Sequence, residues 1–333
     1  MTFAIAILNH NGSILLRRFI PKIIQNCEGA NIYLIDNNST DSSVNFIKKN
    51  NSEIKIISLD SNYGYAEGYN KGIQEINEDV IILLNNDAVF LEKNSFDELC
   101  KTFTLNKDIS IAQPRIIDYN FQEKYEYAGA SGGYLDLLCY PFCRGRILNN
   151  IETSKKYRTT REIFWASGSC FAIRKDTFNE LGGFDQDFFC HMEEIDLCWR
   201  LKNNKPESKI ITAGKSKVYH IGGGTMQYDN PKKNYLNFRN SIMMMIKNLP
   251  LVSLVPIIIL RFVSDFFIML LSMLTLNLNL SFSILSAYAY NIINARNNFK
   301  KRTESKKTNN YYHTKSILIS YYIFGKKTFS SLK

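Results

Sequence analysis

The segment VIILLNND, residues 80–87, is a fully apolar strand candidate that ends in two asparagines and an aspartate. Three earlier segments follow the same plan, a short apolar run that ends in polar side chains, at residues 3–8, 31–35 and 54–59. Stretches with helical spacing of apolar residues separate these runs, at residues 13–26, 41–49 and 67–76. Strands that alternate with helices predict βαβ units, a mostly parallel sheet and an α/β fold.

Polar clusters follow all four predicted strands, as NHNG at 9–12, DNNSTD at 36–41, DSNYG at 60–64 and NND at 85–87. Right-handed crossovers bring the carboxyl ends of the strands to one edge, where open α/β sheets bind ligands. One such cluster would be explained as a turn, but four at one edge favour a ligand-binding crevice. The chain holds neither a GxGxxG after the first strand nor a GxxxxGK[ST], which argues against a dinucleotide-binding or P-loop site.

The composition is that of a globular protein. The chain has 333 residues, of which 45% are hydrophobic and 22% are charged, and these values exclude a disordered chain and a polytopic membrane protein. Seven cysteines without a CxxC pair indicate free thiols in a reducing compartment. The first residues, MTFAIAILNHNG, lack the basic start and the cleavage site of a secretion signal, so none is expected.

The last hundred residues differ from the rest in hydropathy and in charge. Residues 249–276 are mostly Leu, Ile, Val, Phe and Met, but Arg261 interrupts them, and the uncharged run before it is too short to span a bilayer. Residues 296–333 carry ten Lys or Arg and one acid. Apolar helices beside a basic tail predict attachment to an anionic membrane surface through residues 249–333. The alternatives are a single membrane-spanning helix and an ordinary helical subdomain that packs on the rest of the chain.

Seven motifs occur in order between residues 3 and 225: NHNG, IDNNSTDSS, NYGYAEGYNKG, LLNNDAVF, WASGSCFAIRKDTFNELGGFDQDFF, MEEIDLCWRLK and VYHIGGGT. Together they resemble the family 2 glycosyltransferases, which have a GT-A fold with a Rossmann-like central sheet. They are most similar to the bacterial rhamnosyltransferase and galactofuranosyltransferase-like branch, which builds cell-surface polysaccharide. The resemblance implies a catalytic domain over residues 1–233, with a nucleotide-sugar half (1–115) and an acceptor half (116–233). Apolar helices and a basic tail would occupy residues 234–333.

The resemblance also implies residues that hold the nucleotide-sugar donor. Asp36, at the end of the second strand, corresponds to a carboxylate that binds the nucleotide base or ribose, although an Asx turn at a helix start would explain it equally. The full set implied for the donor is Asn9, Asp36, Asn38, Asn62, Asn70, Asn86 and Asp87.

Asp87 and His220 are the implied metal ligands. In the family an acidic motif after the fourth strand binds a divalent cation that bridges the donor diphosphate, and here only its last position, Asp87, is acidic. His220 precedes three glycines, where a phosphate could approach the backbone closely. Carboxylate, imidazole and phosphate ligands suit Mn²⁺ or Mg²⁺. On its own, His220 would be an ordinary strand-end histidine.

An acidic cluster, Glu193-Glu194-x-Asp196, supplies the implied catalytic residues. Three neighbouring acids repel one another, which favours a raised pKa on one of them and suits a general base. The family's base aligns with Glu194, one methylene longer than the usual Asp, so the sequence leaves Glu193 and Glu194 both open. A helix N-terminus that favours acids is the alternative. Arg200 is placed to pair with Asp196, and the acceptor or sugar pocket would include Trp165, Gly168 and Ser169.

The resemblance therefore implies an inverting glycosyltransferase that moves a sugar from a nucleotide-sugar donor to a lipid-linked or oligosaccharide acceptor. The QxxRW element of processive synthases is absent, so one or a few sugars are expected per encounter. We expect a peripheral enzyme on the cytoplasmic face of the bacterial inner membrane, with no nucleic-acid partner. The alternatives are a non-catalytic GT-A scaffold that docks a glycan-assembly complex, and a sugar-nucleotide pyrophosphorylase, whose glycine-rich basic loop is missing near residue 1.

Overall fold

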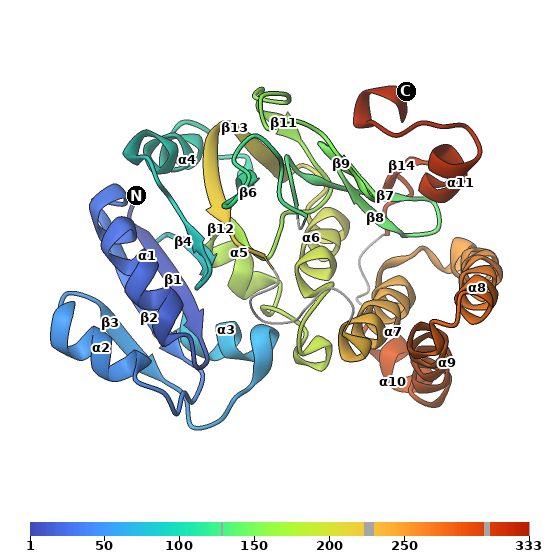
Figure 1. Ribbon diagram of the computed structural model, residues 1–333, viewed down its shortest axis with the longest axis horizontal. Helices are drawn as coiled ribbons and strands as arrows, with labels where there is room; N and C mark the ends of the chain where they lie inside the picture. Colours follow the sequence, from blue (N-terminus) through green and yellow to red (C-terminus); the bar gives the residue numbers. More distant parts are fainter. Residues whose placement is uncertain (128, 223–229, 303–306, 333) are drawn as a thin grey trace.

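Residues 3–85 form the alternating α/β unit that the apolar runs predict. The computed structural model describes residues 1–127, 129–222, 230–302 and 307–332 (Figure 1). The first elements are β1 (Phe3–Asn9), α1 (Ser13–Asn26), β2 (Ala30–Asp36), α2 (Ser43–Asn50), β3 (Lys55–Ser58), α3 (Gly64–Gln74) and β4 (Val80–Asn85). The four strands pair in parallel in the order β4-β1-β2-β3. Asn9 pairs with Asp36 and Leu8 with Asn85, so the polar strand ends lie in a row at one edge.

The following residues extend this sheet with strands of mixed direction. They form β5 (Ala88–Val89), α4 (Lys93–Leu105), β6 (Ile109–Asp118), β11 (Arg161–Glu162), β12 (Cys170–Arg174), α5 (Lys175–Glu180), η1 (Gln186–Phe188), α6 (Glu193–Asn204) and β13 (Lys209–His220). β12 lies antiparallel between β4 and β6, and β13 runs parallel to β6. β5 pairs with the end of β13, with Ala88 opposite His220. This register brings the end of β13 to the loop that follows β4.

A second, smaller sheet lies beside the first. Its strands are β7 (Gly133–Asp136), β8 (Pro141–Cys143), β9 (Arg146–Ile147), β10 (Asn150–Ile151) and β14 (Tyr312–Thr314). β14 comes from the basic tail and pairs in parallel with β7. The tail is therefore part of the folded body at this point.

The C-terminal helices are α7 (Pro231–Asn248), α8 (Leu251–Leu274), α9 (Leu278–Ile293), α10 (Ala295–Lys300) and α11 (Ile317–Tyr322), with a last turn η2 (Phe329–Leu332). α7 begins at a side-chain cap, since Asn230 accepts a hydrogen bond from the backbone N–H of Lys232. α7 contacts α6 and also packs against α9 (Figure 1). Phe329 stacks on His313 and donates its backbone N–H to Glu152. The boundary that we predicted at residues 233 and 234 thus falls at the start of α7, but packing continues across it.

α8 is an apolar helix of 24 residues with one polar pair on its packed face. By length and mean hydropathy (2.3) it could cross a membrane, although our reading of the sequence ended the apolar run at Arg261. Arg261 and Asp265 are buried and paired, 2.9 Å apart, and the guanidinium lies over the ring of Tyr140. The pair allows the helix to continue through both charges. The opposite face is open, with Val252 91% and Leu274 80% exposed.

Candidate active site

A cavity of about 440 Å³ lies at the carboxyl edge of the main sheet. The ends of β4 and β13 supply part of its wall, and the first residues of α6 and α7 supply another part. Eight of the residues that we predicted for the site line this cavity: Asn62, Asn86, Asp87, Gly168, Ser169, Glu193, Glu194 and His220. The polar strand ends and the acidic motif of the second half therefore face one cavity.

Asp87 and His220 meet directly in this cavity. The Oδ1 of Asp87 lies 2.9 Å from the Nε2 of His220, and the other ring nitrogen, Nδ1, lies 3.3 Å from a carboxylate oxygen of Glu126. All three side chains are buried. Burial alone would lower the pKa of His220, but the two carboxylates raise it to about 10. The described residues contain no group of three or more His, Cys, Asp or Glu placed to hold a metal ion.

Glu193 and Glu194 occupy the first turn of α6, where Glu193 is buried and Glu194 is partly exposed. Burial raises the pKa of Glu194 to about 7, while hydrogen bonds from backbone N–H groups, including that of Gly168, act in the opposite direction. Burial and the charge of Glu194 raise the pKa of Glu193 well above its usual value. One carboxyl oxygen of each side chain has no hydrogen-bond partner among the described residues. Glu194 can therefore gain and lose a proton near neutral pH, and the pKa of Glu193 is raised as well.

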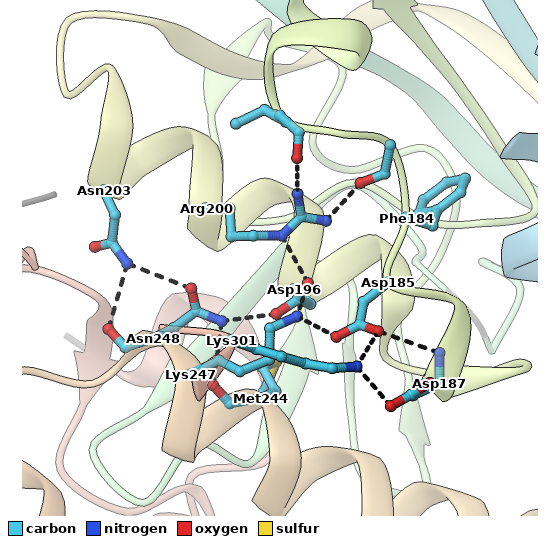
Figure 2. Close-up of polar contacts among 12 residues, drawn as sticks. Phe184, Asp185, Asp187, Asp196, Arg200, Asn203, Met244, Lys247, Asn248 and Lys301 are labelled. Carbon is cyan, nitrogen blue, oxygen red and sulfur yellow. Dashed lines mark hydrogen bonds and ion pairs between the residues drawn. The ribbon is translucent and has the colours of Figure 1, made fainter. Parts of the chain in front are cut away.

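Asp196 lies at the interface between α6 and α7, outside the set of cavity-lining residues. It is fully buried and accepts hydrogen bonds from Arg200 (2.8 Å), Lys247 (2.9 Å) and Asn248 (2.8 Å) (Figure 2). Burial opposes its charge, but Lys247 and Arg200 lower its pKa to about 2. A carboxylate so placed stays ionised and holds two helices together, so we leave Asp196 out of the catalytic step. Its predicted pairing with Arg200 is confirmed.

Several predicted donor residues lie beneath or beside the cavity. Asn9 is buried, donates to the hydroxyls of Ser39 and Ser43, and accepts a hydrogen bond of 3.0 Å from Asn86. Gly12 fits against this pair, because a Cβ there would stand 2.3 Å from the Oδ1 of Asn9. Asn9 and Gly12 therefore position Asn86, which does line the cavity.

The remaining predicted residues also lie outside the lining set. Asp36 accepts from the backbone of Ser39 at 3.2 Å, as in the Asx-turn alternative, yet its Oδ1 is buried without a partner among the described residues. Asn38 holds a left-handed backbone conformation beside it, with φ of 61°. Asn70 exchanges two hydrogen bonds of 2.8 Å with the backbone of Phe184. Trp165 is buried and donates its indole N–H to the carbonyl of Tyr134, so it belongs to the core.

The cavity also contains residues that reasoning from the sequence missed. They are chiefly His10, Asn37, Tyr65, Glu126, Tyr127, Phe189, His191, Lys232 and Lys233. His10 and Asn37 stand inside motifs that we quoted, and the Lys232-Lys233 pair is visible as a basic doublet shortly after VYHIGGGT. Glu126 comes from the stretch before the small sheet and carries no such signal. Gly223 and Gly224, which we expected near a phosphate, lie outside the described residues.

Comparisons with known proteins give relatives in sequence and in fold. The model of the family described as glycosyl transferase family 2 matches residues 4–182. A low-salt glycan biosynthesis hexosyltransferase of Haloferax volcanii is 24% identical over 63% of this chain, and an N-acetylglucosaminyl-diphospho-decaprenol L-rhamnosyltransferase of Mycobacterium tuberculosis is 24% identical over 56%. The aligned parts make up 66% of each of these relatives.

A solved structure with a similar fold is GalNAc-T7, crystallised with UDP, GalNAc and Mn²⁺. It superimposes with a TM-score of 0.56 at 20% identity and covers 74% of this chain and 47% of its own. At this identity the likeness concerns the fold. The fold of the body is thus the one that the motifs of the sequence implied.

Proposed function

The chain belongs to glycosyl transferase family 2 and is a glycosyltransferase with a GT-A fold, and on this premise we propose that it transfers a sugar from a nucleotide-sugar donor with inversion. The observation that carries the proposal is the shared cavity, in which a carboxylate–imidazole pair and an acid pair face one space. The carboxylate–imidazole pair would stabilise the leaving diphosphate, and the acid pair would take the proton of the attacking hydroxyl. A scaffold without catalysis would require neither.

In the proposed reaction Glu194 is the general base. Its carboxylate accepts the proton of an acceptor hydroxyl while the hydroxyl oxygen forms a bond to the anomeric carbon. The bond between that carbon and the diphosphate oxygen breaks on the opposite face, so the configuration inverts and no covalent sugar–enzyme intermediate is formed. Burial supports this role because it raises the pKa of Glu194 to about 7, where the carboxylate can both accept and release a proton. Burial and the neighbouring charge raise the pKa of Glu193 beside it, which disfavours a second negative charge.

Asp87 and His220 would hold a divalent cation, Mn²⁺ or Mg²⁺. In this structure the Nε2 of His220 and the Oδ1 of Asp87 bind each other at 2.9 Å on the cavity wall. An ion would replace this contact and displace the proton of His220, and one oxygen and one nitrogen would then face it. Glu126, 3.3 Å from the other ring nitrogen, stands where carboxylates commonly orient a metal-binding histidine. When bound, the cation would offset the charge that develops on the departing diphosphate. The protein supplies two ligands, and diphosphate and water would supply the others.

The acceptor that we propose is a lipid-linked or oligosaccharide hydroxyl. The name of the Mycobacterium tuberculosis relative places its own acceptor on a decaprenol lipid. In this chain, most of the exposed large apolar side chains lie after residue 250, on α8, α9 and α11. These helices lie at one end of the molecule (Figure 1). Together with the basic residues of the tail they suit an anionic membrane surface, and we propose peripheral attachment at the cytoplasmic face of a bacterial inner membrane.

A thermal-shift panel tests this proposal. Nucleoside diphosphates (UDP, GDP, dTDP) and their sugars are added with and without Mn²⁺, and a true ligand at 100 times its Kd should stabilise the fold by about 2.7 kcal/mol. We expect one nucleotide to raise the melting temperature, more so with Mn²⁺. The Asp87→Asn variant should keep the fold and lose the part of the increase in melting temperature that depends on Mn²⁺. A panel in which no nucleotide or nucleotide sugar shifts the melting temperature would contradict the proposal.

A further inference from the structure

The chain enters α6 through a strained turn. Phe189, His191 and Met192 all have positive φ angles, of 61°, 70° and 71°, and Met192 directly precedes the Glu193–Glu194 pair. Each such conformation costs a side-chain-bearing residue on the order of 1–2 kcal/mol and persists only when the surroundings hold it. Phe189 and His191 also line the cavity. The position of the acid pair therefore depends on whatever fixes residues 188–192.

A buried amide contacts three carbonyls of this turn, while the backbone N–H groups of Tyr65 and Ala66 bind a fourth, that of Phe189. The Nδ2 of Asn240, on α7, lies 3.0 Å from the carbonyl of Phe188, 2.9 Å from that of Cys190 and 2.7 Å from that of His191. Asn240 is fully buried. Arg239 donates to the Oδ1 of Asn240 at 2.8 Å, which sets the orientation of the amide.

Arg239 also holds the start of the turn. Its Nη2 lies 2.8 Å from the carbonyl of Asp187 and 3.1 Å from that of Phe188. Two consecutive residues of α7 thus supply donors to four carbonyls of the segment before the acid pair. A helix alone cannot satisfy carbonyls in such a turn, because positive φ angles point them away from the ladder.

A second contact from the same helix lies on the other side of the acid pair. Lys247 follows Asn240 by seven residues and thus shares its face of α7. Its Nζ bridges Asp185, before the turn, and Asp196, after the acid pair, at 2.7 and 2.9 Å (Figure 2). Lys301, after α10, binds Asp185 and Asp187 at 2.6 Å each. Residues 185–196 are therefore tied to the C-terminal helices at both ends and in the middle.

We propose that Asn240 is a positioning residue, which holds the turn at 188–192 and thereby sets the carboxylates of Glu193 and Glu194 in the cavity. α7 lies beyond residues 4–182, the part that the family model matches, so this chain completes its acceptor side with a helix from its C-terminal region. The proposal rests on the proposed function for the meaning of the acid pair. It makes the C-terminal helices part of the active site as well as a candidate membrane surface.

Hydrogen–deuterium exchange on the full-length chain tests the contact itself. In Asn240→Ala the amides of residues 187–196 should exchange at least about tenfold faster, whereas the sheet strand β4 should be unchanged. The matched control is Asn237→Ala on the same helix, which keeps the three hydrogen bonds to the turn. If Asn240→Ala does not fold, exchange is measured in Arg239→Met instead. This variant loses the guanidinium contacts with the carbonyls of Asp187 and Phe188. It also leaves the side-chain amide of Asn240 free to rotate away from the turn. Equal exchange of residues 187–196 in the folded variant and the control would overturn the proposal.

Kinetics then separate positioning from general damage. Release of nucleoside diphosphate is followed with the nucleotide sugar that stabilises the protein in the thermal-shift panel. A displaced base should lower kcat on the order of 10- to 100-fold in the folded variant while the donor KM stays within about twofold. Parallel changes in kcat and KM, or an unchanged kcat, would contradict the positioning role. If the wild-type chain cleaves no nucleotide sugar, the proposed function fails, and the exchange experiment still decides whether Asn240 holds the turn.

Discussion

The imidazole Nε2 of His220 lies 2.9 Å from the Oδ1 of Asp87, although the two residues stand at the ends of different strands, far apart along the chain. The cause is the pairing of β5 with β13, which sets Ala88 opposite His220. Neither residue needs a flexible loop to reach the other. The hypothesis that they bind one cation requires this closeness, and the fold supplies it through main-chain pairing.

Removal of this pair should abolish metal-dependent transfer. We expect Asp87→Asn and His220→Ala each to lower kcat on the order of 10²–10³-fold, the usual cost of losing one group that stabilises a developing negative charge. Chelation with EDTA should have a similar effect on the wild type, and added Mn²⁺ or Mg²⁺ should reverse it. The measurement is sugar transfer in a metal titration. Equal rates with and without divalent ions would rule out the metal role.

Substitution of the base should affect chemistry and spare donor binding. Glu194→Gln should lower kcat on the order of 10²–10⁴-fold, because it removes the proton acceptor and keeps the shape. The reactive form is the carboxylate, and burial raises the pKa of Glu194 to about 7. Wild-type kcat should therefore fall as the pH drops below about 7. Donor affinity by calorimetry is the control.

The neighbouring acid provides the comparison for that experiment. Burial and the charge of Glu194 raise the pKa of Glu193, which disfavours its carboxylate form, so Glu193→Gln should cost far less in kcat than Glu194→Gln. The reverse order would assign the base to Glu193. If kcat does not fall as the pH drops below neutral, neither Glu193 nor Glu194 is the general base.

The sequence predicts the main sheet because most strands of its parallel part are long enough to appear as apolar runs that end in polar residues. The apolar runs before Asn9, Asp36 and Asn85 each fill most of a buried strand, and a parallel sheet places their ends together. The acid motif and His220 were found through resemblance. The apolar pattern and the resemblance to known motifs both depend on residues that are close together in the sequence.

The missed parts depend on pairing over long distances. The strands of the small sheet have two to four residues each, too few to show a period, and one of them comes from the basic tail. Asn240 reads as one more polar residue on an amphipathic helix, and its three carbonyl partners become visible only in the fold. Asp196 was grouped with the acid pair as part of the same acidic motif, although its position on the helix turns it toward Lys247.

Asp196 should matter for stability. Asp196→Asn removes the only carboxylate that pairs with the buried Arg200 among the described residues, while Lys247 keeps its contact with Asp185, and this should cost about 3 kcal/mol in the free energy of unfolding. In the wild type the pKa of Asp196 is lowered to about 2 against about 3.9 when unfolded. Its contribution is therefore present above pH 4 and is lost as the pH falls toward 2. Urea denaturation across this range measures it, and Asp108→Asn, in an exposed ion pair with Lys209, is the control.

The exposed apolar face of α8 should bind lipid. Deletion of residues 249–333 is too coarse a test, because it also removes β14 and Phe329 from the body. We expect Val255→Glu and Phe267→Glu, which are 62% and 59% exposed in the wild type, each to weaken binding to vesicles containing phosphatidylglycerol about tenfold or more. Ile14→Glu, on α1 and 82% exposed, is the control and should bind normally. Wild-type protein that stays out of the vesicle fraction would refute the attachment.

α8 should lie on the membrane and not cross it. Arg261 and Asp265 are bound on the packed face, where Tyr140 and Tyr288 donate hydroxyl hydrogen bonds to Asp265, and a crossing would carry this cluster into hydrocarbon at high cost. Cysteines introduced at the two ends, Val252→Cys and Leu274→Cys, should therefore react equally with a membrane-impermeant maleimide on vesicles that carry bound protein. The parent chain, with five of its seven cysteines buried, supplies the background. Labelling at one end, with the other end protected until detergent is added, would show that the helix spans the bilayer.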